Sequence, residues 1–157
     1  MKTEYINIYN NLIKLTRNKL LYENLTKNET FSDRLVFLLL HLSFFLKNYK
    51  SKNTKKEMQE IHDFIFKQIE ISIREIGYGD VSINKNMKKY VNFFYDILAK
   101  IDNWDSYLSN EKCEILHNYI DNPKNITIYA NYFDNLTIFY KNNPLTFFTK
   151  DIEEFKI

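Results

Sequence analysis

The residue types that usually carry catalysis are sparse in this sequence of 157 residues. It has three histidines, His41, His62 and His117, and one cysteine, Cys113. They stand too far apart to form a zinc site, and the sequence contains no nucleophile motif and no phosphate-binding loop. Asp63 follows His62, but adjacent residues on a helix point apart, so we expect no catalytic pair there. We therefore expect a protein that is not an enzyme and that uses no metal or other cofactor.

Both glycines of the chain fall within one short segment. The segment, which we call the glycine segment, reads Arg74-Glu75-Ile76-Gly77-Tyr78-Gly79-Asp80. In a chain so poor in glycine, this clustering indicates a turn that no side chain would tolerate, or the close approach of another backbone. We expect a tight turn between two helices, with Gly77 ending the first and Asp80 helping to cap the second. A partner could contact the same turn, because the two roles are compatible.

Two arginines stand out by their positions. Arg34 opens an otherwise apolar helix, and Arg74 lies near the end of another, beside the glycine segment. An arginine next to an apolar surface needs carboxylate partners, and for Arg74 the nearest candidates are Glu75 and Asp80. Two interpretations stay open. The arginines either form structural ion pairs, or they dock a client or the ribosome.

Exposed lysines form two groups. They are Lys50, Lys52, Lys55 and Lys56 in one segment, and Lys85, Lys88 and Lys89 in another. The formal net charge of +2 is too small to indicate a nucleic-acid partner by itself. The lysines are therefore either solvated, or they contact ribosomal RNA or an anionic membrane surface, where binding would weaken with salt.

The elements that position these residues are helices. The chain has only two glycines and two prolines, with 45% hydrophobic residues, which favours long helices over turn-rich β or Rossmann-type folds. We expect an all-α, compact single domain over residues 1–157, a bundle of about six helices near 5–25, 33–49, 55–76, 83–101, 110–120 and 128–141. The C-terminal tail is expected to end extended. Residues 126–129 fit either a helix or a short strand.

The helix expected at 33–49 is apolar nearly all round, which is typical of a helix at the centre of a domain. Ser32 or Asp33 can cap its N-terminus. His41, within this helix, is expected to be a hydrogen-bonded core residue and not a metal or haem ligand. Thr54 and Glu57 form a capping box for the next helix, whose inner stripe includes Met58, Ile61, Ile65, Ile69 and Ile73.

Targeting signals are not expected. The N-terminal residues lack the apolar stretch of a signal peptide, and the longest apolar run, Leu35 to Leu46, is shorter than the ~20 residues that cross a bilayer. One cysteine suits a reducing compartment. We expect a cytoplasmic protein, either free or held peripherally at the inner face of the inner membrane.

Several segments, in their order and spacing, resemble one protein family. They are Thr16-Arg17-Asn18 through Tyr22, Asp33-Arg34-Leu35, Leu40-His41-Leu42, the glycine segment, Asn84 to Lys89 and Phe93-Phe94-Tyr95, with looser matches at Asn118-Tyr119 and Tyr132. Together they resemble the ubiquinol–cytochrome c chaperone family, strongly from about Leu15 to Tyr95 and weakly after Trp104.

The resemblance implies an assembly chaperone for ubiquinol–cytochrome c reductase (respiratory complex III) that binds newly made cytochrome b. In mitochondrial members it implies action near the ribosomal tunnel exit with a small partner subunit, and this chain looks like a bacterial member. The expected client is cytochrome b or another complex III subunit. The ribosome and a small partner subunit are further candidate partners, and DNA is not.

Such a chaperone needs an exposed apolar or aromatic patch larger than ordinary surfaces carry. The candidate partner-binding residues are Arg34, Arg74, Glu75, Gly77, Tyr78, Gly79, Asp80, Met87, Tyr90 and Tyr95. The alternative function is a ribosome- or RNA-associated binding module that acts through the lysine segments.

Overall fold

The computed structural model describes residues 2–77, 79–155 and 157, and over this part of the chain the regular elements are helices. In chain order they are α1 (Lys2–Thr16), α2 (Lys19–Glu23), α3 (Phe31–Tyr49), α4 (Lys55–Glu75), α5 (Asp80–Ile101), the 3-10 helix η1 (Trp104–Ser106), α6 (Ser109–His117), α7 (Ile126–Asn142) and α8 (Leu145–Phe148). The only β-type pairing described is an isolated antiparallel bridge between Leu25 and Pro123. The predicted all-α class is confirmed.

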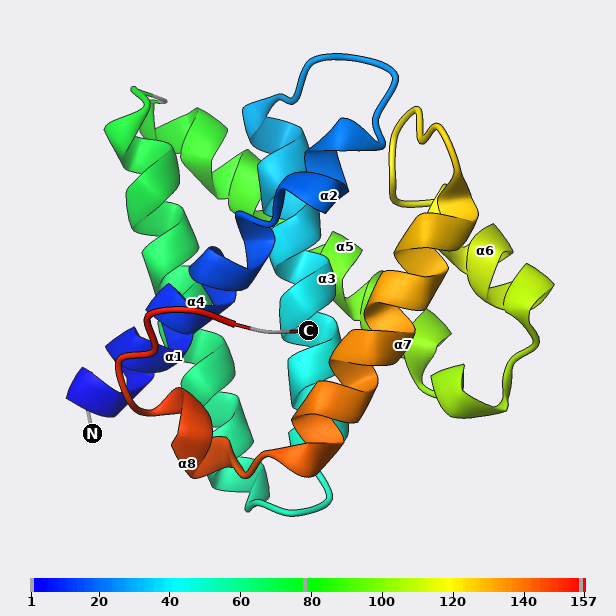
Figure 1. Cartoon of the computed structure of the whole chain (residues 1–157). Helices are drawn as coiled ribbons and strands as arrows, with labels where there is room; N and C mark the ends of the chain where they lie inside the picture. The colour runs from blue at the N-terminus through cyan, green and yellow to red at the C-terminus, as the bar shows by residue number, and fades with distance from the viewer. Residues whose placement is uncertain (1, 78, 156) are drawn as a thin grey trace.

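Helix α3 runs through the middle of the fold. Figure 1 shows α1 and α4 on one side of it, α7 on the other, and α5 passing behind. Helices α1, α5 and α7 all pack on α3, and α6 packs on α7. The prediction that the apolar segment at 33–49 forms a central helix is therefore confirmed.

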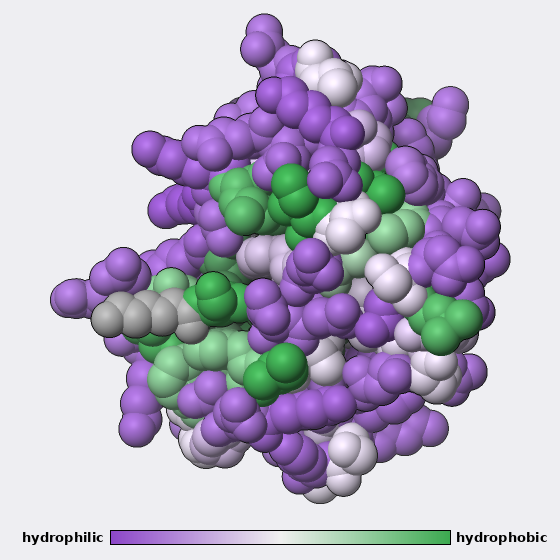
Figure 2. Space-filling model, turned by 45° about the vertical axis from the view of Figure 1, so that its right-hand side comes forward, coloured by the Kyte–Doolittle hydropathy of each residue, from purple (hydrophilic) through white to green (hydrophobic). Residues whose placement is uncertain are grey.

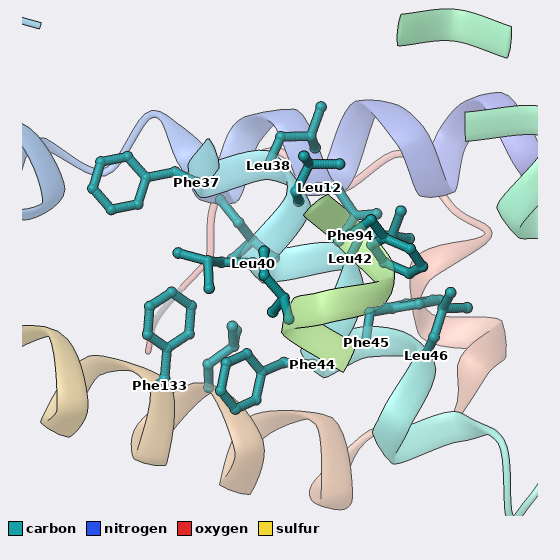
Figure 3. Packing of buried hydrophobic residues seen from close by; sticks show 14 of the residues in the cluster. Leu12, Phe37, Leu38, Leu40, Leu42, Phe44, Phe45, Leu46, Phe94 and Phe133 are labelled. Atoms are coloured by element: carbon teal, nitrogen blue, oxygen red, sulfur yellow. The ribbon is translucent and has the colours of Figure 1, made fainter. Parts of the chain in front are cut away.

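The core is unusually rich in aromatic rings. Figure 3 shows Phe44 of α3 next to Phe133 of α7, and their ring centroids lie 4.8 Å apart in a stacked arrangement. Trp104 of η1 packs edge-on against Phe44 at 5.0 Å and is completely buried. Large rings bury much apolar surface with few rotatable bonds, so they hold α3, α7 and the η1 segment in one fixed arrangement.

Several helix boundaries differ from the predicted ones. The helix expected at 5–25 is broken into α1 and α2, because Asn18 takes an extended conformation and caps α2 by accepting a hydrogen bond from the backbone N–H of Leu20. Residues 126–129 belong to helix α7, which resolves the helix-or-strand alternative. The tail after α8 contains neither a helix nor a strand in its described residues.

Helix α3 begins two residues earlier than expected. Thr30 is its cap, and Thr30 and Asp33 form a capping box in which each side chain binds the backbone N–H of the other residue. The prediction that Ser32 or Asp33 is the cap was wrong, since Asp33 is the third helical residue. Burial would raise the pKa of Asp33, but hydrogen bonds from Lys27 and Thr30 outweigh it and hold the pKa below its usual value.

Helix α4 matches its prediction closely. Thr54 caps it by accepting a hydrogen bond from the Glu57 backbone N–H, which is one of the two bonds of the predicted capping box; the reciprocal bond to the Glu57 side chain is not among those of the described residues. The predicted inner stripe is buried at Met58, Ile61, Ile65, Ile69 and Ile73. No described helix is long and apolar enough to serve as a membrane span.

The C-terminal tail is bound to α1. The side-chain amide of Asn11, completely buried in α1, donates hydrogen bonds to the carbonyls of Phe148 and Lys150 at 2.9 and 2.8 Å. Lys14 forms an ion pair with Asp151 at 2.9 Å. The last residues of the chain therefore help to fix the first helix.

Candidate partner-binding groove

The glycine segment is an open turn at the surface between α4 and α5. Gly77 has φ +93°, a left-handed value that side chains rarely adopt, so this position requires glycine. Gly79 has φ −71° and precedes α5 as its cap residue. A Cβ atom added at either glycine would meet nothing within 4 Å, so among the described residues no other backbone approaches the turn closely.

Apolar side chains flank this turn and are left in solvent. Ile76 is 51% exposed and Val81 is 85% exposed. Tyr78, which we expected to be a contact residue, and the side chain of Asp80 lie outside the described part of the structure. Single exposed aliphatic residues are common on protein surfaces, so Ile76 and Val81 do not by themselves mark a site.

A groove of about 540 Å³ lies between α1, α2, α3 and α4. Its apolar lining comes from Tyr9, Ile13, Phe31, Leu35, Leu38 and Ile69. We call this hollow the apolar groove. Its size falls within the range of roughly 300–1,000 Å³ that is usual for binding sites in proteins.

Ser72 of α4 is the groove residue nearest in sequence to the glycine segment. Ile76, four residues later, is the C-cap residue of α4 and is 51% exposed, but it does not line the groove. The groove and the glycine segment are therefore separate surface features at either end of the last turn of α4.

The rim of the apolar groove is charged, with three cations and two carboxylates. They are Arg17, Lys19, Arg34, Glu23 and Glu29. Arg34 lies 3.6 Å from Glu29 and above the ring of Phe31 at 5.9 Å from its centroid, so it is held at the mouth of the groove. Arg17 also borders a neighbouring hollow lined by Glu153 and Glu154 of the tail. Of the two arginines singled out from the sequence, Arg34 lies at the groove.

Arg74 lies on the exposed side of α4. It donates a hydrogen bond to Glu70 at 3.3 Å, one turn earlier on the same helix. The sequence suggests Glu75 and Asp80 as partners; Glu70 is a partner that it does not point to, and the side chain of Asp80 lies outside the described part of the structure. The ion pair is within α4, so it stabilises the end of that helix before the glycine segment.

The aromatic residues expected on α5 do not form one patch. Tyr90 lines a second hollow of about 380 Å³ together with Phe93 and Tyr119. Tyr95 is 48% exposed and its hydroxyl lies 3.3 Å from Nε2 of His62 on α4. Five residues on a helix rotate the side chain by more than a third of a turn, so Tyr90 and Tyr95 face different surroundings. Met87 is half-buried against the core.

The side chains of His62 and Asp63 are in contact, although we expected them to point apart. The Nδ1 atom of His62 lies 2.9 Å from the carboxylate of Asp63, although adjacent helical residues usually point apart. Gln59, one turn earlier, also donates to that carboxylate at 2.8 Å. Asp63 thus bends back along the helix surface.

His41 is a core residue, as predicted. It is fully buried, and its two ring nitrogens meet the Phe37 carbonyl and the Tyr132 hydroxyl. Burial lowers its pKa from 6.5 to about 4, although the bond to Phe37 acts in the opposite direction. A neutral imidazole with both nitrogens occupied has no free position for a metal. Among the described residues, no cluster of three or more histidine, cysteine or acidic residues could hold a metal ion.

The two lysine groups are exposed but lie far apart. Lys50, Lys52, Lys55 and Lys56 surround the α3–α4 connection, whereas Lys85, Lys88 and Lys89 follow the turn at the other end of α4. A helix of the 21 residues of α4 is about 30 Å long. Lys50 is bound to Asp102 at 2.9 Å, and Lys52 donates to the Lys141 carbonyl. The lysines therefore do not form a single basic face.

The residues of the groove floor could not have been separated from the core by sequence alone. Tyr9 and Ile13 of α1 follow the same helical spacing as the fully buried Ile8 and Leu12, yet they are only partly buried, whereas Ile69 of α4 lines the groove at 1% exposure. The exposure of Tyr9 and Ile13 depends on the break between α1 and α2 and on how α1 lies against α4. The break does have a signal, since Asn18 is a residue type that favours helix N-caps.

The surface outside the groove carries smaller apolar areas. Figure 2 shows one face of the molecule, on which hydrophobic residues gather in separate patches between hydrophilic ones. Ile138 of α7 and Leu108 are examples of single exposed apolar residues. Scattered residues of this kind are normal on soluble surfaces and do not indicate a site.

Comparison with known proteins places the chain in a family. Residues 23–122 match the model of a family described as ubiquinol–cytochrome C chaperone. This range includes α3, α4, the glycine segment and α5. Searches of curated proteins and of solved structures found no significant match. Since the matched range is more than half of the chain, the protein belongs to the ubiquinol–cytochrome C chaperone family.

Proposed function

We propose that this protein is a non-enzymatic assembly chaperone of ubiquinol–cytochrome c reductase and that its client is newly made cytochrome b. Family membership supports the class of function. The observation that carries the mechanism is the apolar groove between α1, α2, α3 and α4. Cytochrome b is a hydrophobic membrane protein, so a segment waiting for haem and partner subunits needs its apolar surface covered.

The groove can cover such a segment by non-covalent binding alone. Its floor offers aliphatic and aromatic surface from α1, α3 and α4, and its charged rim stays in water. Binding then gains free energy from buried apolar area, at roughly 25 cal/mol per Å². Release requires only that another complex III subunit bury the same client surface more completely.

The experiment is a gene replacement scored by the amount of assembled complex III. Ile13→Asp, which places a charge in the groove, is expected to lower complex III and to abolish crosslinking to cytochrome b. Ile138→Asp is the matched control, because Ile138 is exposed on α7 outside the groove lining. Both purified variants must melt cooperatively. Normal complex III in a strain that lacks the gene would disprove the proposal.

A ribosome- or RNA-binding role is less well supported by the geometry. The lysines that would carry it lie at opposite ends of α4, and two of them, Lys50 and Lys52, are engaged with neighbouring acceptors. Binding of ribosomes that falls steeply with salt would favour that role.

A further inference from the structure

The chemistry of the apolar groove restricts what can occupy it. Two turns of an α-helix, about 11 Å long and 10 Å across, fill roughly 850 Å³. The groove offers about 540 Å³, so it holds part of the width of a helix and leaves the rest outside. An occupant that is helical therefore inserts one apolar face and keeps its opposite face in contact with water or with another subunit.

The charged residues at the rim of the groove favour an occupant with acidic residues. Among the residues that line the groove, three cations exceed two carboxylates, and Glu29 already faces Arg34. Glu153 and Glu154 of the tail line the neighbouring hollow, which Arg17 also borders, and not the groove. Arg17 and Lys19 stand together at the junction of α1 and α2, with Glu23 as the nearby rim carboxylate. An acidic residue on the occupant would therefore gain more from this rim than a basic one.

We infer that the apolar groove binds one face of an amphipathic helix that carries acidic residues next to its apolar stripe, with those residues against Arg17, Lys19 and Arg34. The inference rests on the proposed function, since it names the kind of client segment that the chaperone recognises. Helix-in-groove recognition reads apolar anchors at positions i, i+3, i+4 and i+7. The groove offers them apolar surface mainly from the partly buried Tyr9, Ile13 and Phe31, since Leu35, Leu38 and Ile69 are at most 4% exposed.

The test uses the purified full chain and three synthetic helical peptides with identical leucine stripes. One carries two glutamates beside the stripe, one carries glutamines and one carries lysines, and binding is measured by fluorescence anisotropy. We expect the glutamate peptide to bind at least about tenfold more tightly than the lysine peptide at low salt. The double variant Arg17→Glu/Arg34→Glu should reverse this order.

The matched control is Lys100→Glu, because Lys100 is exposed on α5 and does not line the groove. This variant should keep the preference for the glutamate peptide. Equal binding of all three peptides, or an unchanged order in the double variant, would overturn the inference. Preferential binding of neutral phospholipid vesicles, lost in Ile13→Asp, would also overturn it by making a lipid the occupant.

The two proposals fail separately. If the peptides show no charge preference but loss of the gene still lowers complex III, only the inference about the client helix is wrong. If loss of the gene leaves complex III unchanged, the proposed function is wrong whatever the peptides do.

Discussion

His41 of α3 and Tyr132 of α7 share a hydrogen bond of 2.6 Å between the imidazole Nε2 and the phenol oxygen. Both residues are buried, and Phe133 also packs against the imidazole ring. The bond joins the central helix α3 to helix α7 across 91 residues of sequence. It makes the stability of the fold sensitive to the protonation of one histidine.

Mild acid should destabilise the protein through His41. The unfolded chain takes up a proton at this residue near pH 6.5, whereas the folded chain does so only near a pKa of about 4. The stabilising contribution is therefore complete above pH 6.5 and is lost as the pH falls towards 4, by about 3 kcal/mol. Urea unfolding at several pH values measures this loss of stability. A free energy of unfolding that does not change between pH 6.5 and 4 would contradict the prediction.

The contribution of the hydrogen bond between His41 and Tyr132 can be tested by removing each polar group alone and then both together. Tyr132→Phe alone should cost about 1–2 kcal/mol, because it leaves the buried imidazole nitrogen without its partner. His41→Leu alone leaves the buried Tyr132 hydroxyl unpaired and should also destabilise the fold. The double variant should cost less than the sum of the two, and it should lose the pH dependence described above. Additive losses in a urea double-mutant cycle would show that the bond contributes nothing.

The two glycines should respond differently to substitution. Gly77→Ala should lower the free energy of unfolding by about 1–2 kcal/mol, since alanine is strained at φ +93°. Gly79→Ser should be neutral or slightly stabilising, because φ −71° suits serine and its hydroxyl can cap α5. Thermal melts compare them directly. A Gly79→Ser protein that is stable but no longer crosslinks to its client would place the partner at the turn.

Asp134 should matter more than an ordinary surface carboxylate. It accepts hydrogen bonds from the indole N–H of Trp104 at 2.9 Å and from Lys112 at 2.8 Å. Asp134→Ala leaves the buried indole donor unsatisfied, so it should cost about 1–3 kcal/mol. Asp102→Ala is the control, because Asp102 pairs with Lys50 while both are largely exposed. Equal melting temperatures for the two variants would contradict this role.

The fold was predictable where the hydrophobic pattern is regular. The stripe of α4 repeats every three or four residues, and each predicted member is buried. The start of α3 was harder, because Thr30, Ser32 and Asp33 are all capping types and only the folded chain shows that Thr30 and Asp33 act together. The glycine segment was recognisable because Gly77 needs a conformation that other residues avoid.

The candidate site was predictable only in part. Arg34 and the turn stood out by charge and by residue type, and Arg34 does lie at the groove. Met87, Tyr90 and Tyr95 looked like a patch because they are close in sequence, yet the rotation of α5 separates Tyr90 from Tyr95. Which apolar residues are exposed in the groove depends on how α1 lies against α4. That arrangement is set by contacts between segments that are distant in the sequence.

The hydrogen bonds from Asn11 to the carbonyls of Phe148 and Lys150 link residues that are synthesised at opposite ends of the chain. Because α1 forms one wall of the groove, that wall gains this anchorage only after the residues around Phe148 and Lys150 have been synthesised. The shape of the groove therefore depends on contacts that form late in the folding of this domain.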